Sequence, residues 1–438
     1  MSTADATALP AAGGGEPRRR SLLEAVDRSD AALMSVGTLA SGVLAYLFNV
    51  LAARALGPVG YGAIGALWGG MFLLAVLLFR PLEQTVSRAV AHHVARGEDA
   101  RPAVRSAAWL TLAVTVVAVA GCVLAWAPLT DRLFGGQPVL TVALIAGLVG
   151  YAVSYFARGL AGGVRWFGGY GIVLLADGAI RLLIALPLLF VASQTLAAVA
   201  IAAAAIGGAL APLLSRRRGA VRKLSGPAQG DFRLRQAAGF ALPAAAIAGC
   251  EQVLVSGGPL LVLIAGGEGA AAAAGVLFAA TLLVRAPVFL LQGVQASLLP
   301  NLATFRARGD EGALHRATVR IALMMCAFSL VLAAGSLAIG PAAMTLLYGG
   351  EFAVGRWDLA LLSIGIGGFM AAGVFSQAAL ARTQAWAAAG GWAAGAIAFV
   401  ALELSLHGSP FHRVSVAFAA GSLIAALLLM RTLWRWRT

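Results

Sequence analysis

Long apolar runs separated by short polar segments fill most of this 438-residue chain. Each run extends over about 20 residues, which as an α-helix crosses a hydrocarbon core of about 30 Å and is too long for an ordinary strand. The pattern therefore predicts an all-α polytopic membrane protein with about twelve transmembrane helices. The predicted spans are residues 31–54, 60–80, 106–127, 139–157, 170–191, 195–214, 237–265, 270–298, 317–339, 357–381, 385–405 and 414–433.

The composition supports the membrane assignment. Hydrophobic residues make up 60% of the chain and charged residues 11%, and the mean hydropathy is +0.88. Soluble domains are about half apolar and about a quarter charged. A soluble enzyme or soluble binding module is therefore excluded.

The basic residues predict the orientation of the chain. Arginines gather in alternate loops, above all in residues 80–105, 158–165 and 215–235, and Lys and Arg accumulate in the short cytoplasmic loops of membrane proteins. This bias predicts that both termini are cytoplasmic. The formal charge of +14 is spread over these loops, so it indicates contact with anionic lipid headgroups and no nucleic-acid partner.

The sequence contains no recognisable catalytic or metal-binding motif. The cysteines Cys122, Cys250 and Cys326 fall inside predicted spans without metal-type spacing, and we interpret them as small apolar side chains. The five histidines lie in loops without an HExxH pattern or a neighbouring carboxylate cluster, so they are expected to be solvated. We predict neither a metal nor a cofactor.

Two segment pairs reveal an internal repeat. "GPVGYGAIGALW" at 57–68 is echoed by "GEGAAAAAGVLF" at 267–278, and "VARGEDARPAVRSA" at 94–107 by "RARGDEGALHRATV" at 306–319. Both pairs lie about half the chain apart, which predicts two six-helix bundles related as parallel repeats around a central cavity. The predicted organisation is a cytoplasmic tail at 1–30, a first bundle at 31–214, a basic linker at 215–235, a second bundle at 236–433 and a cytoplasmic tail at 434–438.

Two motifs resemble a known superfamily. "LAARALGPVGYGAIGAL" at 51–67 looks like the junction of the first two helices of the oligosaccharide-lipid (polysaccharide) flippases in the multidrug, oligosaccharidyl-lipid and polysaccharide exporter superfamily. "SLLPNLATFRARGD" at 297–310 is similar to the stretch that ends the eighth helix there. The resemblance implies a bacterial cell (inner) membrane protein without enzyme activity that flips polyprenyl-pyrophosphate-linked oligosaccharides outward for cell-surface polysaccharide synthesis. Glycosyltransferases or a polymerase are the partners that this role implies.

The multidrug branch of the superfamily is the nearest alternative. The resemblance implies an acidic residue in the first helix of cation-coupled drug antiporters, whereas this chain has Ser35, Ser41 and Asn49 in that span and no carboxylate. A membrane glycosyltransferase or polymer ligase is an alternative of another class. Such an enzyme needs a large outer loop for its catalytic groups, and the longest outer segment predicted here is only residues 340–356.

Asp177 and Arg181 are the first pair of charges inside predicted spans. They lie four residues apart on one helix face, and a charge at the bilayer centre costs about 2.5–3.5 kcal/mol unless it faces a partner or a cavity. One interpretation is a structural ion pair. The other is that Arg181 lines the cavity and binds phosphate oxygens through its planar fork, while Asp177 orients it.

Glu251 and Arg285 are the second pair. Counted from opposite membrane faces at about 1.5 Å per residue, both reach the midplane, so they lie at a depth where they could meet. Arg285 is then either a substrate-binding residue or the partner of Glu251. Asp177 and Glu251 are the candidates for proton or sodium coupling, or for charge pairing.

Overall fold

The computed structural model describes residues 16–214, 224–225, 228–229, 234–286 and 311–434. Two two-residue strands, β1 and β2, pair in parallel, and nearly everything else in the described chain is helical. The predicted all-α polytopic class is confirmed. The first part of the chain contains α1 (Glu16–Arg96), β1 (Glu98–Asp99), α2 (Arg101–Leu124), α3 (Trp126–Pro128), η1 (Leu129–Leu133), α4 (Pro138–Gly163), α5 (Phe167–Ala185), η2 (Leu186–Leu189) and α6 (Gln194–Leu214).

The second part contains β2 (Ala228–Gln229), α8 (Leu234–Ala265), an apolar helix Ala270–Ala286, α10 (Glu311–Tyr348), η3 (Gly350–Phe352), α11 (Arg356–Ala381), α12 (Ala385–Ser405) and α13 (Pro410–Trp434). Ten described helices are long and apolar enough to cross a membrane. Counting α1 as two spans and adding the helix Ala270–Ala286 gives the twelve predicted spans (10 + 1 + 1). The end of the predicted span 270–298, and the motif at 297–310, lie outside the described residues.

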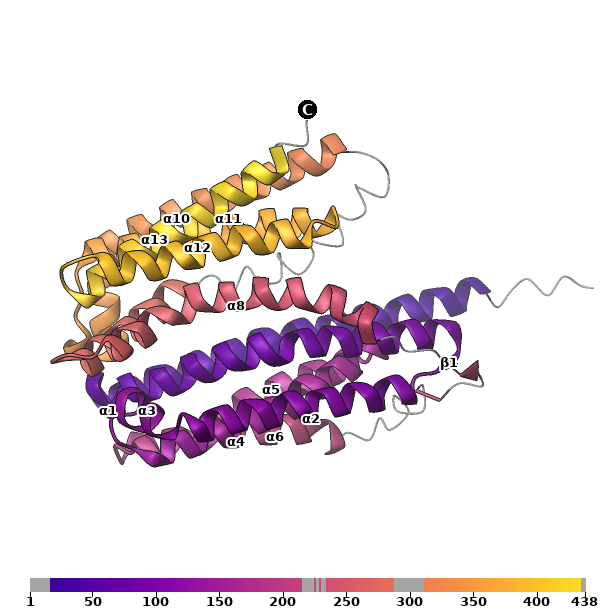
Figure 1. Cartoon of the computed structure of the whole chain (residues 1–438), viewed down its shortest axis with the longest axis horizontal. Coiled ribbons are helices and arrows are strands. Elements are labelled where there is room, and N and C mark those ends of the chain that lie inside the picture. Colours follow the sequence, from indigo (N-terminus) through magenta and orange to yellow (C-terminus); the bar gives the residue numbers. More distant parts are fainter. Residues whose placement is uncertain (1–15, 215–223, 226–227, 230–233, 287–310, 435–438) are drawn as a thin grey trace, which may run out of the picture.

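The first two predicted spans are the two legs of α1. Gly57 adopts φ 66° and ψ 176°, a conformation that interrupts the helix and suits a residue without a Cβ. The chain reverses at this point, and the second leg returns beside the first (Figure 1). Helix α1 also begins earlier than expected, because residues 16–30 of the predicted tail are helical.

The second leg of α1 runs to Arg96, well beyond its predicted end at residue 80. The extension is amphipathic: Val86 and Val90 are buried against Ala100 and Val164 in a small separate core. The hydropathy pattern ends at residue 80 because the outward face of this extension is polar, although its inward face continues to pack.

The helices form two groups whose long axes run roughly the same way (Figure 1). Helices α1 to α6 lie on one side, α10 to α13 on the other, and α8 lies between them. We call the end that carries β1 the basic end, because the arginine-rich stretch 80–105 extends into it. The other end, where Gly57 lies beside Glu351 of η3, is the opposite end. Large apolar side chains such as Val117 (72% exposed) cover the outer surface, as expected for a lipid-facing protein.

The repeated segments meet at the opposite end. An ideal Cβ on Gly62 would lie 2.1 Å from the carbonyl oxygen of Ala271, and one on Gly275 would lie 2.0 Å from that of Pro58. Each helix thus places a glycine against the backbone of the other. Close helix crossings in membranes use small residues in this way.

Candidate functional site

A cavity of about 270 Å³ lies between helices of the first part of the chain and two helices of the second part, α8 and Ala270–Ala286. Its walls come from both legs of α1, from α4 and α5, and from α8 and the helix Ala270–Ala286. Aromatic rings form much of the wall, among them Trp68, Phe72 and Phe278. The charged lining residues in the described chain are Arg158, Asp177, Arg181 and Arg285.

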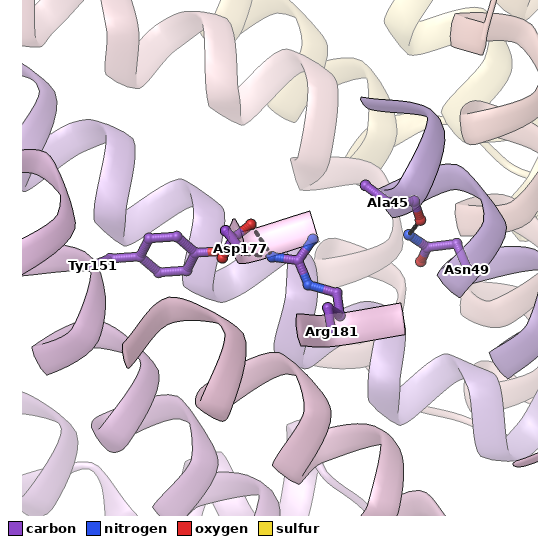
Figure 2. A network of polar contacts seen from close by, with 5 residues as sticks. All are labelled: Ala45, Asn49, Tyr151, Asp177 and Arg181. Atoms are coloured by element: carbon purple, nitrogen blue, oxygen red, sulfur yellow. Dashed lines mark hydrogen bonds and ion pairs between the residues drawn. The ribbon is translucent and has the colours of Figure 1, made fainter. Parts of the chain in front are cut away.

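The predicted pair in α5 is present. Arg181 Nη2 lies 2.5 Å from Asp177 Oδ2, and the two residues are only 1% and 8% exposed (Figure 2). Helical spacing of i and i+4 places both side chains on the cavity face. The ion pair is therefore real and also faces the cavity, so the two interpretations of the sequence are compatible.

Two aromatic residues fix the Arg181 guanidinium. Arg181 Nη2 donates to the Tyr151 hydroxyl at 3.0 Å, and that hydroxyl lies 3.3 Å from Asp177 Oδ1 (Figure 2). The Trp68 ring centroid is 4.3 Å from Arg181 Cζ, within the range of a cation–π contact. Within the described chain, Nε of Arg181 is buried without a hydrogen-bond partner, and both polar contacts use Nη2. The other N–H groups of the Arg181 guanidinium are therefore available to hydrogen-bond a ligand.

Tyr151→Phe tests how the guanidinium is held. The change keeps the ring but removes the hydroxyl, so the free energy of unfolding is expected to fall by about 1.5–3 kcal/mol, the range for a hydrogen bond to a charged group. The melting temperature of the purified protein in detergent measures the effect. Trp109→Phe, at a position 66% exposed, is the control and is expected to change little. An unchanged melting temperature in Tyr151→Phe would contradict the proposed network.

Arg158 is a second cation that lines the cavity, although its sequence position predicts a cytoplasmic loop. Arg158 Nη2 lies 2.9 Å from Glu83 Oε2, and Glu83 Oε1 accepts a hydrogen bond from the Tyr170 hydroxyl at 2.8 Å. The Tyr155 ring centroid is 3.8 Å from Arg158 Cζ. The signal was present in the sequence, because Tyr151, Tyr155 and Arg158 recur at i, i+4 and i+7 on one helix face.

Arg285 lines the same cavity from the second part of the chain, but it does not meet Glu251. Among the described residues no ion pair joins the two, and Glu251 is not among the lining residues. The Glu251–Arg285 contact that their common depth suggested is therefore absent among the described residues, and Arg285 faces the cavity without an acidic partner in the described chain.

The polar residues of the first predicted span also contribute. Ser41 and Asn49 line the cavity, and the Asn49 amide donates to the Ala45 carbonyl at 2.8 Å (Figure 2). Asn49 Oδ1 accepts from the Tyr61 hydroxyl at 2.9 Å, so this amide is held from both sides. Asn49 marks the limit of the cavity toward the opposite end.

Beyond Asn49 the opposite end is tightly packed. The Tyr61 ring contacts those of Phe278 and Phe352, with centroids 5.7 and 6.0 Å apart. Arg54 Nε donates to the Leu347 carbonyl at 2.7 Å, near the end of α10. Together with the Gly62 and Gly275 crossings, these contacts close the cavity at this end.

Comparison with known sequences identifies similar chains in mycobacteria. No protein-family profile matches the chain. It is 27% identical over 402 residues to the "Uncharacterized protein Rv3630" of Mycobacterium tuberculosis, covering 89% of both chains, and 26% identical over 411 residues to the "Uncharacterized protein Mb3654" of Mycobacterium bovis, covering 91% of both. The sequence similarity to these relatives therefore extends over about nine-tenths of each chain.

Solved structures of MATE transporters match over nearly the whole chain. An inward-facing multidrug resistance MATE family transporter of the MOP superfamily superposes with a TM-score of 0.69 at 16% identity, over 90% of this chain and 94% of its own. An outward-facing one gives 0.62 at 15% identity, over 94% and 96%, and the eukaryotic MATE transporter AtDTX14 gives 0.63 at 15%, over 93% and 95%. This chain therefore has the fold of the MATE transporters of the MOP superfamily.

Proposed function

We propose that this protein is a membrane carrier that moves polyprenyl-pyrophosphate-linked oligosaccharides to the outer leaflet by alternating access. One observation carries the proposal: Arg181 and Arg285, from different halves of the chain, line the same cavity between those halves. A headgroup held by both would contact both moving parts. The fold of the solved neighbours, described above in inward-facing and outward-facing conformations, supports a carrier.

The charge of the cavity supports an anionic cargo. Three arginines and one aspartate among the charged lining residues give a formal charge of +2 (3 − 1). Glu83 offsets Arg158 from outside the lining, and Asp177 offsets Arg181. Among the described residues, Arg285 is left without a compensating carboxylate. A pyrophosphate oxygen would therefore bind Arg285 without displacing a carboxylate, and guanidinium groups bind such oxygens bidentately.

The volume supports a cargo that is only partly enclosed. About 270 Å³ lies near the lower limit of small-ligand pockets, which is about 300 Å³. The cavity would hold the pyrophosphate and the adjoining sugar, with the aromatic wall against the sugar ring and the polyprenyl chain in the lipid. Glycosyltransferases or a polymerase that make and use such lipids would be its functional partners.

The proposal includes an orientation. With the basic end cytoplasmic, both termini of a bacterial inner-membrane protein lie inside, and the cavity is closed on the outer side by Tyr61, Arg54 and the glycine crossing. This corresponds to a carrier poised to load from the inner leaflet. Asp177 is our candidate for ion coupling, because its protonation would release Arg181.

A multidrug antiporter on the same fold is less favoured. Two of the solved neighbours are multidrug resistance MATE family transporters. In this chain the first leg of α1 contributes hydroxyl and amide groups to the cavity, and Asp177 is already bound to Arg181. A cationic drug would enter a cavity of net positive charge, which is an electrostatic cost.

Proteoliposomes test the proposal. Purified protein is reconstituted with a short polyprenyl-pyrophosphate-linked sugar in one leaflet, and the fraction exposed to an external glycosidase is followed with time. We expect transfer well above that in protein-free vesicles, and none for a neutral glycolipid bearing the same sugar. No transfer of the anionic lipid, combined with accumulation of a cationic dye against a proton or sodium gradient, would replace the flippase by the antiporter.

A further inference from the structure

A cluster of two histidines and one glutamate lies at the basic end, apart from the cavity. His92 and His93 are in the last turns of α1, and Glu98 follows in β1 after the turn at Gly97. One ligand atom from each of the three side chains lies within 4.8 Å of the others. The sequence predicts that these histidines are solvated and bind no metal, but the side chain of His93 is only 3% exposed. A buried imidazole facing a carboxylate needs a different explanation.

The environment of His93 leaves one ring nitrogen available. Nδ1 lies 2.7 Å from the carbonyl oxygen of Ala89, and because a carbonyl can only accept, Nδ1 carries the proton. Nε2 then has a free lone pair in the neutral ring. Metal-binding histidines are oriented in this way, with one ring nitrogen donating to a carbonyl or carboxylate and the other bound to the ion.

The spacing of the cluster is that of ligands around an ion. His93 Nε2 and Glu98 Oε2 are 3.9 Å apart, which is too long for a hydrogen bond. Ligand atoms about 2.0–2.2 Å from a tetrahedral ion lie about 3.4 Å from one another, so a shift of a few tenths of an ångström brings these two into place. His92 is exposed at the surface and can turn toward the same point.

We propose that His92, His93 and Glu98 bind a divalent transition-metal cation of the zinc class. Two imidazoles and one carboxylate suit zinc, cobalt or nickel better than calcium or magnesium, which prefer oxygen ligands. Three protein ligands leave a fourth position for water. The nearest competing cation is Arg96, whose Nη1 lies 3.7 Å from Glu98 Oε1, but its side chain is 63% exposed and can move into solvent.

The position of Glu98 gives the metal a structural consequence. Strand β1 pairs with β2, which belongs to the segment joining the two halves of the chain, and the Ala100 amide donates to the Leu224 carbonyl of that segment at 2.9 Å. A metal bound by α1 and by β1 would fix β1 to the end of α1, and with it the paired strand β2 and Leu224. The inference is independent of the proposed cargo.

The test uses the full chain in detergent, freed of any affinity tag and stripped with a chelator. Calorimetric titration with Zn²⁺ is expected to show one ion per chain, and Co²⁺ is expected to give the visible absorption of a tetrahedral site. His92→Gln and Glu98→Gln should each weaken Zn²⁺ binding at least about 10-fold, by analogy with losses around known metal ligands. His407→Gln, exposed at the opposite end, should leave it unchanged.

Zn²⁺ should also raise the melting temperature of the unchanged protein and of His407→Gln, but not that of Glu98→Gln. This readout distinguishes loss of the ion from misfolding, because each variant is compared with itself in the absence of metal. Absence of Zn²⁺ binding to the unchanged protein would overturn the proposal. Equal binding by Glu98→Gln would also overturn it.

Discussion

Changing Arg285 or Arg181 to glutamine is expected to lower the rate of lipid-linked sugar transfer by about 10- to 100-fold, because each change removes charge-assisted hydrogen bonds of about 1.5–3 kcal/mol to the phosphate oxygens. Glutamine keeps a polar side chain but is shorter and loses the charge and the fork. The proteoliposome assay measures the rate at low substrate concentration, where binding limits transfer.

The two arginines differ in what their removal leaves behind. Arg285 has no acidic partner in the described chain, so Arg285→Gln should leave the melting temperature nearly unchanged. Arg181→Gln strands Asp177 in the interior, and breaking a buried pair in this way costs about 3–5 kcal/mol. A loss of transfer in Arg181→Gln alone is therefore ambiguous between binding and stability.

The double variant Asp177→Asn/Arg181→Gln resolves this ambiguity. It removes both charges, so the stability lost in Arg181→Gln should largely return. If Arg181 binds cargo, transfer stays low although the protein is stable again. If the pair is only structural, transfer recovers together with the melting temperature. Arg132→Gln, exposed at the opposite end, is the charge-matched control and should transfer sugar normally.

Normal transfer by Arg285→Gln and by the stable double variant would refute the arginine-binding hypothesis. It would leave the fold and the ion pair intact as observations. Metal binding at His92, His93 and Glu98 would be untouched by that outcome, because those residues lie outside the cavity lining.

The sequence predicted what depends on hydropathy and on helical spacing. The spans follow from apolar length, and the Asp177–Arg181 contact follows from a separation of four residues on one helix. The class of fold was therefore predictable. Local exceptions were not: the extension of α1 to Arg96 has a polar outer face, so average hydropathy falls although one side remains packed.

The absence of a contact between Glu251 and Arg285 among the described residues shows why depth alone is insufficient. Counting residues gives the height of each side chain along its helix, but each residue also turns the side chain by about 100° around the axis. Gln252 lines the cavity whereas its neighbour Glu251 does not. The facing of two helices depends on how the whole bundle packs, and counting residues along each helix does not reveal it.

Arg158 is a second residue whose role is hidden by its position along a predicted span. An arginine near the predicted cytoplasmic end of a helix is explained by lipid headgroups, so it was counted with the loops. Its partner Glu83 lies in the polar extension of α1, and pattern analysis did not recognise this extension as a packed helix. The missed arginine and the missed helical extension therefore have the same origin.

The glycine crossing leads to the second large prediction. Gly275→Val places a Cβ 2.0 Å from the Pro58 carbonyl oxygen, a distance that real contacts do not allow, so the two helices must separate at the opposite end. Overpacking of this kind costs about 1–3 kcal/mol, and each 1.4 kcal/mol changes an equilibrium about tenfold. We therefore expect a shift of up to about 100-fold toward conformations in which the cavity opens at that end.

Accessibility of Ser256 measures this shift. Ser256 lines the cavity and is 8% exposed, and Ser256→Cys is nearly isosteric. The native cysteines Cys122, Cys250 and Cys326 are first replaced. A membrane-impermeant maleimide is then applied from the side of the membrane that the opposite end faces. It should label the new cysteine slowly in the parent and at least about 10-fold faster in Gly275→Val. Gly62→Val should act in the same direction, because its Cβ would lie 2.1 Å from the Ala271 carbonyl oxygen.

Gly70→Val is the matched control for this experiment. Gly70 is in the same leg of α1 as Gly62, but a Cβ there meets nothing within 4 Å, so valine fits without moving a neighbour. Its labelling rate should equal that of the parent. If Gly275→Val and Gly62→Val label at the parent rate while remaining folded, the crossing does not close the cavity. If both open it, small residues at this crossing hold the closed conformation, because helix association in lipid depends on close backbone packing.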